Sequence, residues 1–126
     1  WTVTLYDAFS GGNASSTTST GNYTKIGQRI FASFKVSNIN TTGMTAGNRL
    51  TFSLPFQAGS NASIGLCGFD NLNINSGYTT VLSYAGATAT RGYLDASGDA
   101  LGLSNVLVSM LTSGTTDIEV YISYSV

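Results

Sequence analysis

The chain contains six carboxylates, one cysteine and no histidine, which leaves few side chains for acid–base, nucleophilic or metal chemistry. Asp70, Asp95, Asp99 and Asp117 are expected at strand ends, where an aspartate side chain commonly caps a turn. Glu119 falls in the middle of an alternating strand pattern. These placements favour structural roles for the carboxylates.

Two carboxylate arrangements would support more specific chemistry. Asp95 and Asp99 bracket Ala96-Ser97-Gly98, loosely as in a calcium loop, but the spacing matches no EF-hand pattern. A glycosidase needs a pair of carboxylates, which can be distant in sequence. The turn-like aspartates do not favour such a pair, and the chain is predicted not to be an enzyme. We therefore expect no catalytic residue, no metal site and no cofactor.

Cys67 is the only thiol, so an intrachain disulfide is impossible. It lies in the apolar run 64–69, where a small buried hydrophobic side chain is the simplest interpretation. A catalytic thiolate would need a histidine or a basic neighbour, and the nearby sequence supplies neither.

Aromatic and amide side chains offer a different kind of site, because tyrosine rings stack on sugar faces and Asn, Asp and Arg bond sugar hydroxyls. Tyr78, Tyr84 and Tyr93 fall near the ends of two adjacent expected strands. The same tyrosines could instead be half-buried core or subunit-contact residues with their hydroxyls in water. The ligand-binding residues expected at one polar end of the fold are Asp70, Asn71, Asn73, Tyr78, Arg91 and Tyr93.

Short alternating strands must position these side chains. The segments 29–37 and 118–126 each place apolar residues on one face with the clearest period of two. Further strands are expected at 2–6, 23–26, 50–56, 62–69, 78–85 and 90–94, and Pro55 marks a strand end. The segment 11–21 is expected to be a polar loop, and 101–111 is unclear. About eight strands in one domain, residues 1–126, predict an all-β antiparallel β-sandwich of jelly-roll type.

Composition narrows the partners. Charged residues are only 9 % of the chain and the net charge is −1, so nucleic acid and anionic membranes are not expected to bind. No run of 18 apolar residues exists, so no membrane insertion is expected. A near-neutral surface limits the solubility of a lone monomer, which indicates that other chains cover part of it.

Three blocks carry a family resemblance: Gly21-Asn22-Tyr23-Thr24-Lys25-Ile26-Gly27, the strand 29–36, and Leu54-Pro55-Phe56. In this order, with Trp1 to Leu5 before them and Tyr121-Ile-Ser-Tyr124 after, they resemble the C-terminal domains of bacteriophage tail fibres and tailspikes. Val3 departs from the family pattern, which often has proline there. From the residues themselves, Gly21 and Gly27 are expected at positive φ, and Tyr23 and Ile26 in the core.

The resemblance implies a homotrimeric β-sandwich domain at the distal end of a virion appendage, acting outside the cell in trimerisation, receptor binding or both. The receptor would be a host cell-surface polysaccharide, and the domain would end a longer chain. It supplies no receptor residues, because those lie in loops that vary between phages. Three alternatives stay open: a trimerisation or folding-nucleus domain of the same appendages that binds no ligand, a capsid-decorating or other virion structural protein, and a polysaccharide-cleaving enzyme domain.

Overall fold

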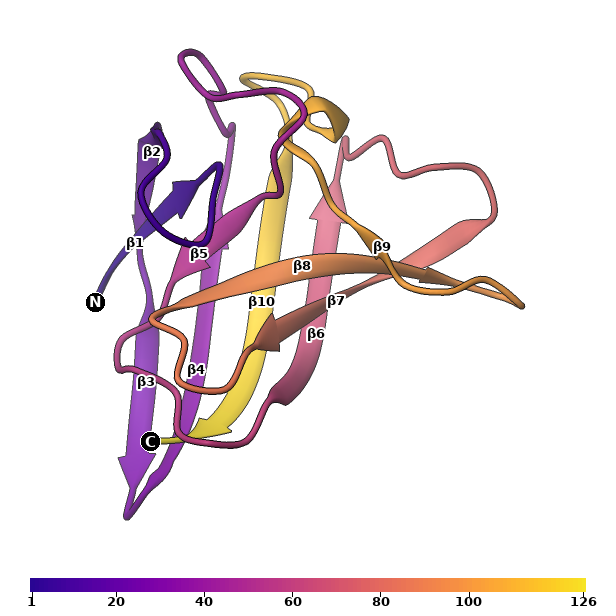
Figure 1. Ribbon diagram of the computed structural model, residues 1–126. Helices are drawn as coiled ribbons and strands as arrows, with labels where there is room; N and C mark the ends of the chain where they lie inside the picture. Colours follow the sequence, from indigo (N-terminus) through magenta and orange to yellow (C-terminus); the bar gives the residue numbers. More distant parts are fainter.

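The computed structural model describes residues 1–126 and consists almost entirely of antiparallel strands (Figure 1). The ten strands are β1 (Thr2–Tyr6), β2 (Ala14–Thr20), β3 (Asn22–Ile26), β4 (Arg29–Val36), β5 (Thr51–Ser53), β6 (Ser63–Asp70), β7 (Tyr78–Ala85), β8 (Arg91–Gly98), β9 (Ser104–Asn105) and β10 (Asp117–Ser125). The only helix is a 3-10 turn at Val108–Met110, and no helix is long or apolar enough to cross a membrane.

The strands form one sheet in the order β2-β1-β5-β8-β7-β6-β10-β4-β3, with β9 beside β8. Only Gly21 separates β2 from β3, so the two ends of the sheet meet and the barrel is nearly closed. Ser19 Oγ of β2 also donates to the Lys35 carbonyl of β4 at 2.5 Å. Side-chain hydrogen bonds thus complete a seam that backbone pairing leaves open.

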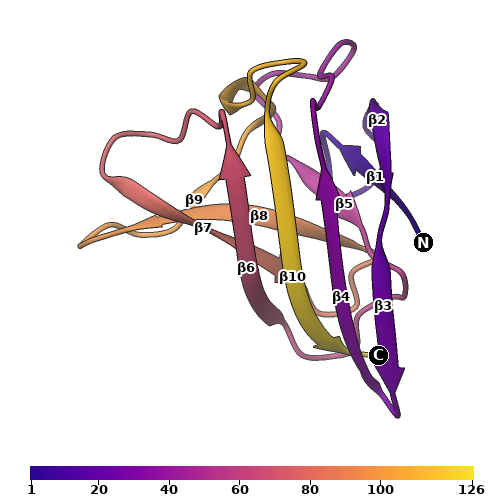
Figure 2. The ribbon, with the colours of Figure 1, turned by 180° about the vertical axis from the view of Figure 1, so that it is seen from behind.

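The sheet folds over on itself around one core. Strands β7 and β8 run across β6 and β10 at a steep angle, and the views from the front and from behind agree on this (Figures 1 and 2). The predicted all-β antiparallel class is confirmed, with ten strands instead of about eight. The predicted sandwich of jelly-roll type is not confirmed.

The two clearest predicted strands form the centre of the core. Strand β4 pairs with β10 over eight residue pairs, from Ile118↔Val36 to Ser125↔Arg29. Their inward side chains are buried: Ile30, Ala32, Phe34 and Val36 on β4, and Ile118, Val120, Ile122 and Tyr124 on β10. Alternation places these residues on one face of each strand, as the sequence predicts, and the structure shows that this face is the core. Pro55 follows the end of β5, also as predicted.

The expected polar loop at 11–21 is wrong, because residues Ala14–Thr20 form β2. This strand pairs with β1 through Thr2↔Thr20 and Thr4↔Thr18. Most residues of β2 are exposed to solvent, and the strand has no large apolar side chains. Backbone pairing with β1, and not an apolar face, therefore makes this segment a strand. The unclear segment 101–111 contains β9 and the 3-10 turn.

The expected burial of Tyr23 and Ile26 is also wrong, because every residue of β3 is exposed. Strand β3 lies at the end of the sheet order, so no further strand covers it. Gly27 has a φ of +59°, as expected for the turn into β4, but Gly21 does not have a positive φ. Gly21 is required for another reason: a Cβ there would overlap the ring of Trp1.

Candidate functional site

The largest hollow of the molecule is an open groove on the outer face of β3, β4, β10 and β6, the face toward the reader in Figure 2. We call it the outer groove; its volume is about 520 Å³. Four apolar side chains line it with exposed fractions of 49 % for Phe31, 62 % for Ile64, 64 % for Leu66 and 53 % for Tyr121. The polar side chains along it are Asn22, Thr24, Ser33 and Ser123.

Strand register brings these residues together from distant parts of the sequence. Tyr121 of β10 lies between Ser33 of β4 and Leu66 of β6. Phe31 pairs with Ser123 in the next outward-facing row. Neighbouring outward residues of paired strands lie close enough for their side chains to touch. The result is an apolar patch bordered by hydroxyls.

Gly65 allows the floor of the groove to form. It lies between the outward-facing Ile64 and Leu66, and a Cβ at this position would overlap the Tyr121 carbonyl and crowd Ser83 Oγ, 2.7 Å away. The sequence predicts a bulge or a close approach of backbone at the glycines of this strand. The close approach is confirmed at Gly65.

The two ends of the outer groove carry different charges. At one end, Arg29 donates from Nε to Ser123 Oγ at 2.7 Å. Beyond the other end lies a smaller polar hollow of about 190 Å³ whose charged side chains are Lys35, Asp70, Asp117 and Glu119. The groove therefore has one basic end and one end with an excess of carboxylates.

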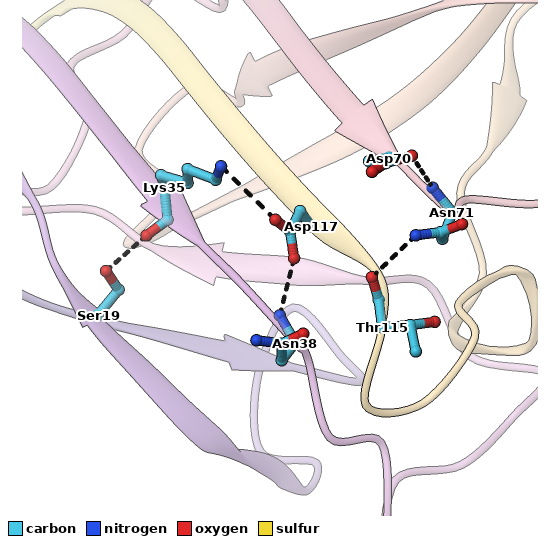
Figure 3. Close-up of polar contacts among 7 residues, drawn as sticks. All are labelled: Ser19, Lys35, Asn38, Asp70, Asn71, Thr115 and Asp117. Atoms are coloured by element: carbon cyan, nitrogen blue, oxygen red, sulfur yellow. Dashed lines mark hydrogen bonds and ion pairs between the residues drawn. The ribbon is translucent and has the colours of Figure 1, made fainter.

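Each charged side chain at this second end has a partner within the chain, and Figure 3 shows the partners of Lys35, Asp117 and Asp70. Asp117 accepts a hydrogen bond from the Asn38 backbone N–H at 2.8 Å and lies 3.5 Å from Lys35 Nζ. The backbone hydrogen bond from Asn38, then the side-chain hydrogen bond from Ser37 and the charge of Lys35, lower the pKa of Asp117. Tyr121 donates its hydroxyl to Glu119 at 2.5 Å, which raises the pKa of Tyr121. No group of three or more His, Cys, Asp or Glu side chains is arranged to hold a metal ion.

The predicted ligand-binding residues do not form one site. Tyr78 begins β7 and pairs with Gly98, whereas Tyr84 near the other end of the strand pairs with Tyr93. Six residues of an extended strand span roughly 20 Å. The structure thus places Tyr78 with the Asp70 end of β6, and Arg91 with Tyr93 at the far end of β8.

The first group of predicted residues ties loops together (Figure 3). Asp70 accepts from the backbone N–H of Asn71, and Asn71 donates from Nδ2 to the Thr115 carbonyl at 3.2 Å. Asn73 donates from Nδ2 to Thr112 Oγ1 at 3.2 Å. These bonds link the β6–β7 loop to the segment before β10, which is a structural role.

The second group also has partners. Arg91 donates to the carbonyls of Ala8 at 2.6 Å and Gly11 at 2.8 Å, and its guanidinium lies 3.6 Å from the Tyr6 ring centroid. Tyr93 stacks on Tyr84 with ring centroids 5.1 Å apart. The contacts of Arg91 hold the loop between β1 and β2 against β8.

The expectation that Asp95 caps a strand end is wrong. Asp95 lies inside β8, is buried, and forms an ion pair with Arg49. Burial raises the pKa of Asp95, and the attraction of Arg49 opposes this. The Asp95 carboxylate therefore faces Arg49 and is not part of a calcium loop with Asp99.

Cys67 is buried as predicted, and its burial raises the thiol pKa to about 12. A thiol with such a pKa is not a nucleophile at neutral pH.

The residues of the outer groove were not among the predicted site residues. Phe31 and Tyr121 occupy outward positions of the two clearest strands. An aromatic residue on the otherwise polar face of a strand was therefore one sequence feature that could have indicated this surface. A second such feature was the pair of large apolar residues Ile64 and Leu66, which flank Gly65 and so share one face of β6. Sequence alone did not say which face of these strands is the core.

Comparisons with known proteins add no relative: no protein-family model, no curated protein and no solved structure matches the chain.

Proposed function

We propose that the chain is a non-enzymatic assembly and attachment domain of a bacteriophage tail fibre or tailspike. In this proposal three copies associate at the end of the appendage and bind a host cell-surface polysaccharide. The phage assignment rests on the sequence resemblance, and the jelly-roll type rests on the number and spacing of the predicted strands. Self-association rests on the outer groove.

The exposed apolar face of the outer groove is the observation that carries the proposal. Phe31, Ile64, Leu66 and Tyr121 lie side by side on four-stranded sheet surface and have no covering segment of the chain. Contiguous apolar patches on soluble proteins commonly mark interaction surfaces. Fully burying one such side chain gains about 1.5–3 kcal/mol. A net charge of −1 gives little repulsion between copies.

Attachment to a glycan is assigned to the loops. The β4–β5 loop, the β6–β7 loop and the segment before β10 gather at one end of the barrel (Figure 1). They are rich in amide and hydroxyl side chains such as Asn40, Asn71 and Thr115. Three copies would display this end three times, so weak binding at each copy becomes useful avidity.

Solution mass tests the assembly half of the proposal. The wild-type chain is expected to have three times the 13.1 kDa chain mass in light scattering. Phe31→Ser is expected to give monomers. Phe9→Ser is the matched control, because Phe9 is 45 % exposed against 49 % for Phe31 but lies outside the groove. A monomeric wild-type chain would contradict the proposal.

Binding to host polysaccharide tests the attachment half. The wild-type chain is expected to bind an immobilised host polysaccharide and to release no reducing ends from it. Phe31→Ser is expected to bind at least tenfold more weakly because avidity is lost. Release of reducing ends that disappears in an aspartate-to-alanine variant would instead establish the polysaccharide-cleaving alternative. Assembly without any glycan binding would favour a virion structural protein.

A further inference from the structure

The turn between β8 and β9 projects from the barrel. In both views it extends sideways beyond the other strands (Figures 1 and 2). We call residues Asp99–Leu103 the arm. All five are exposed, and Leu101 and Leu103 expose 45 % and 56 % of their surface. Two leucines at the end of a projecting turn are not explained by the core of their own chain.

The base of the arm is fixed. Ala96 pairs with Ser104 and Asp95 with Asn105. At Gly98 a Cβ would overlap the Gly77 carbonyl, so the β7 end packs closely against the arm. Ala100 has a φ of +55°, which is unfavourable for a residue with a side chain. The arm is therefore a turn with a defined backbone conformation, held at its base by strand pairing.

The outer groove offers a surface of matching chemistry. It is apolar, open and about 520 Å³ in volume, within the size range in which proteins hold whole ligands. No residue of the arm lines it. The arm and the outer groove are thus two separate apolar surfaces on one chain.

Charge supports a match between these two surfaces. Asp99 is the one carboxylate of the chain that has no hydrogen bond or ion pair within it. Arg29, at the basic end of the outer groove, has Ser123 Oγ as its side-chain partner and no carboxylate. Asp99 lies two residues before Leu101, as Arg29 lies two residues before Phe31. Asp99 of the arm and Arg29 of the groove are therefore opposite charges that both lack an ionic partner within the chain.

We propose that the arm of one copy inserts Leu101 and Leu103 into the outer groove of the next copy, with Asp99 paired to Arg29. The occupant of the groove is thus a second copy of this chain. Because the contact joins two different surfaces, it is heterologous, and such contacts close into rings when the rotation between copies fits. The inference rests on the self-association in the proposed function and specifies its contact.

Mixing two variants tests the contact. The arm variant Leu101→Ser/Leu103→Ser and the groove variant Leu66→Ser are each expected to be monomers in light scattering, with wild-type circular dichroism. Mixed in equal amounts, they are expected to form a species of two chain masses, because the intact arm of one fits the intact groove of the other. Phe9→Ser is expected to keep the wild-type mass.

The outcomes separate this inference from the proposed function. An arm variant with wild-type mass beside a monomeric groove variant would overturn the arm contact and leave self-association through the groove standing. A groove variant with wild-type mass would overturn the arm contact and the assignment of the groove to self-association.

As a second test, Asp99→Arg and Arg29→Asp are each expected to raise the dissociation constant for self-association at least tenfold, and the double variant is expected to restore it. Failure of the double variant to recover would refute the charge pairing.

Discussion

Asp7 is a buried carboxylate that organises two loops by accepting hydrogen bonds. Its oxygens accept from the backbone N–H of Asn13 at 2.5 Å and of Thr45 at 2.7 Å, and from Asn13 Nδ2 at 3.2 Å. Burial by itself raises the pKa of Asp7, but these hydrogen bonds together outweigh burial and lower it. The folded state thus favours the ionised form. Asp7 holds the β1–β2 loop and the β4–β5 loop in place.

The lowered pKa of Asp7 has a predictable effect on stability. The ionised Asp7 side chain contributes fully to the free energy of unfolding above the pKa of an unfolded aspartate, about 3.9. This contribution is lost as the pH falls through the lower folded-state pKa of Asp7. Asp7→Asn is expected to reduce the free energy of unfolding by about 2 kcal/mol at pH 7, because charged hydrogen bonds are weakened. The difference between wild type and variant should shrink as the pH falls below about 4.

Urea unfolding of both proteins between pH 2.5 and 7 measures this difference directly. The comparison uses the difference in free energy of unfolding between the two proteins because the pKa of Asp95 is raised. Protonation of Asp95 at low pH therefore changes the stability of both proteins in the opposite direction and cancels in the difference. A difference that stays constant down to pH 2.5 would show that the charge of Asp7 has no part in holding the loops.

At the scale of elements, the sequence predicted strands best where one face is buried. The ends of strands β4 and β10 were predicted to within one residue, because the inward residues of each strand, such as Phe34 and Val120, alternate with outward residues around one core. Strand β2 was missed because Ser and Thr along it give no apolar period. Its place depends on pairing with β1, which no local pattern encodes. The outer groove was missed for a similar reason: register between β4, β6 and β10 creates it.

Glycine inside a strand often marks the close approach of a neighbouring group, and β8 offers a test of this. Gly92 pairs with Phe52 of β5, and a Cβ at Gly92 would overlap the Phe52 ring and lie 2.8 Å from the Tyr84 carbonyl. Gly92→Ala is therefore expected to lower the free energy of unfolding by about 1–3 kcal/mol, the usual effect of overpacking. The urea midpoint should fall at an unchanged m-value.

Gly86→Ala is the matched control for this variant. A Cβ at Gly86 would meet its nearest neighbours at 3.8 Å, which is ordinary contact, and its φ is not positive. We expect this variant to stay within about 0.5 kcal/mol of wild type or to gain slightly. Equal destabilisation by both substitutions would mean that backbone freedom, and not the Phe52 ring, requires glycine in β8.

At the scale of the whole molecule, one residue joins the two ends of the sheet. Gly21 links β2 to β3, and its backbone N–H donates to the Trp1 carbonyl at 2.8 Å. The indole of Trp1 lies over Gly21, donates from Nε1 to the Ser53 carbonyl at 3.2 Å, and meets the Phe34 ring edge-on at 6.0 Å between centroids. Trp1 thus fills the seam where the barrel nearly closes.

Gly21→Ala tests whether this seam holds the barrel together. The added Cβ would overlap the indole, so either Trp1 leaves the seam or β2 separates from β3. We expect a loss of about 1–3 kcal/mol in the free energy of unfolding. Trp1 is the only tryptophan, so its emission should shift to the red in the folded variant as the indole gains contact with water.

Gly47→Ala is the control, because a Cβ at Gly47 meets nothing within 4 Å. This variant should change neither the free energy of unfolding nor the emission wavelength. If the emission of Gly21→Ala stays at the wild-type wavelength with wild-type stability, the seam tolerates a side chain and closure depends on the β2 to β4 hydrogen bonds instead.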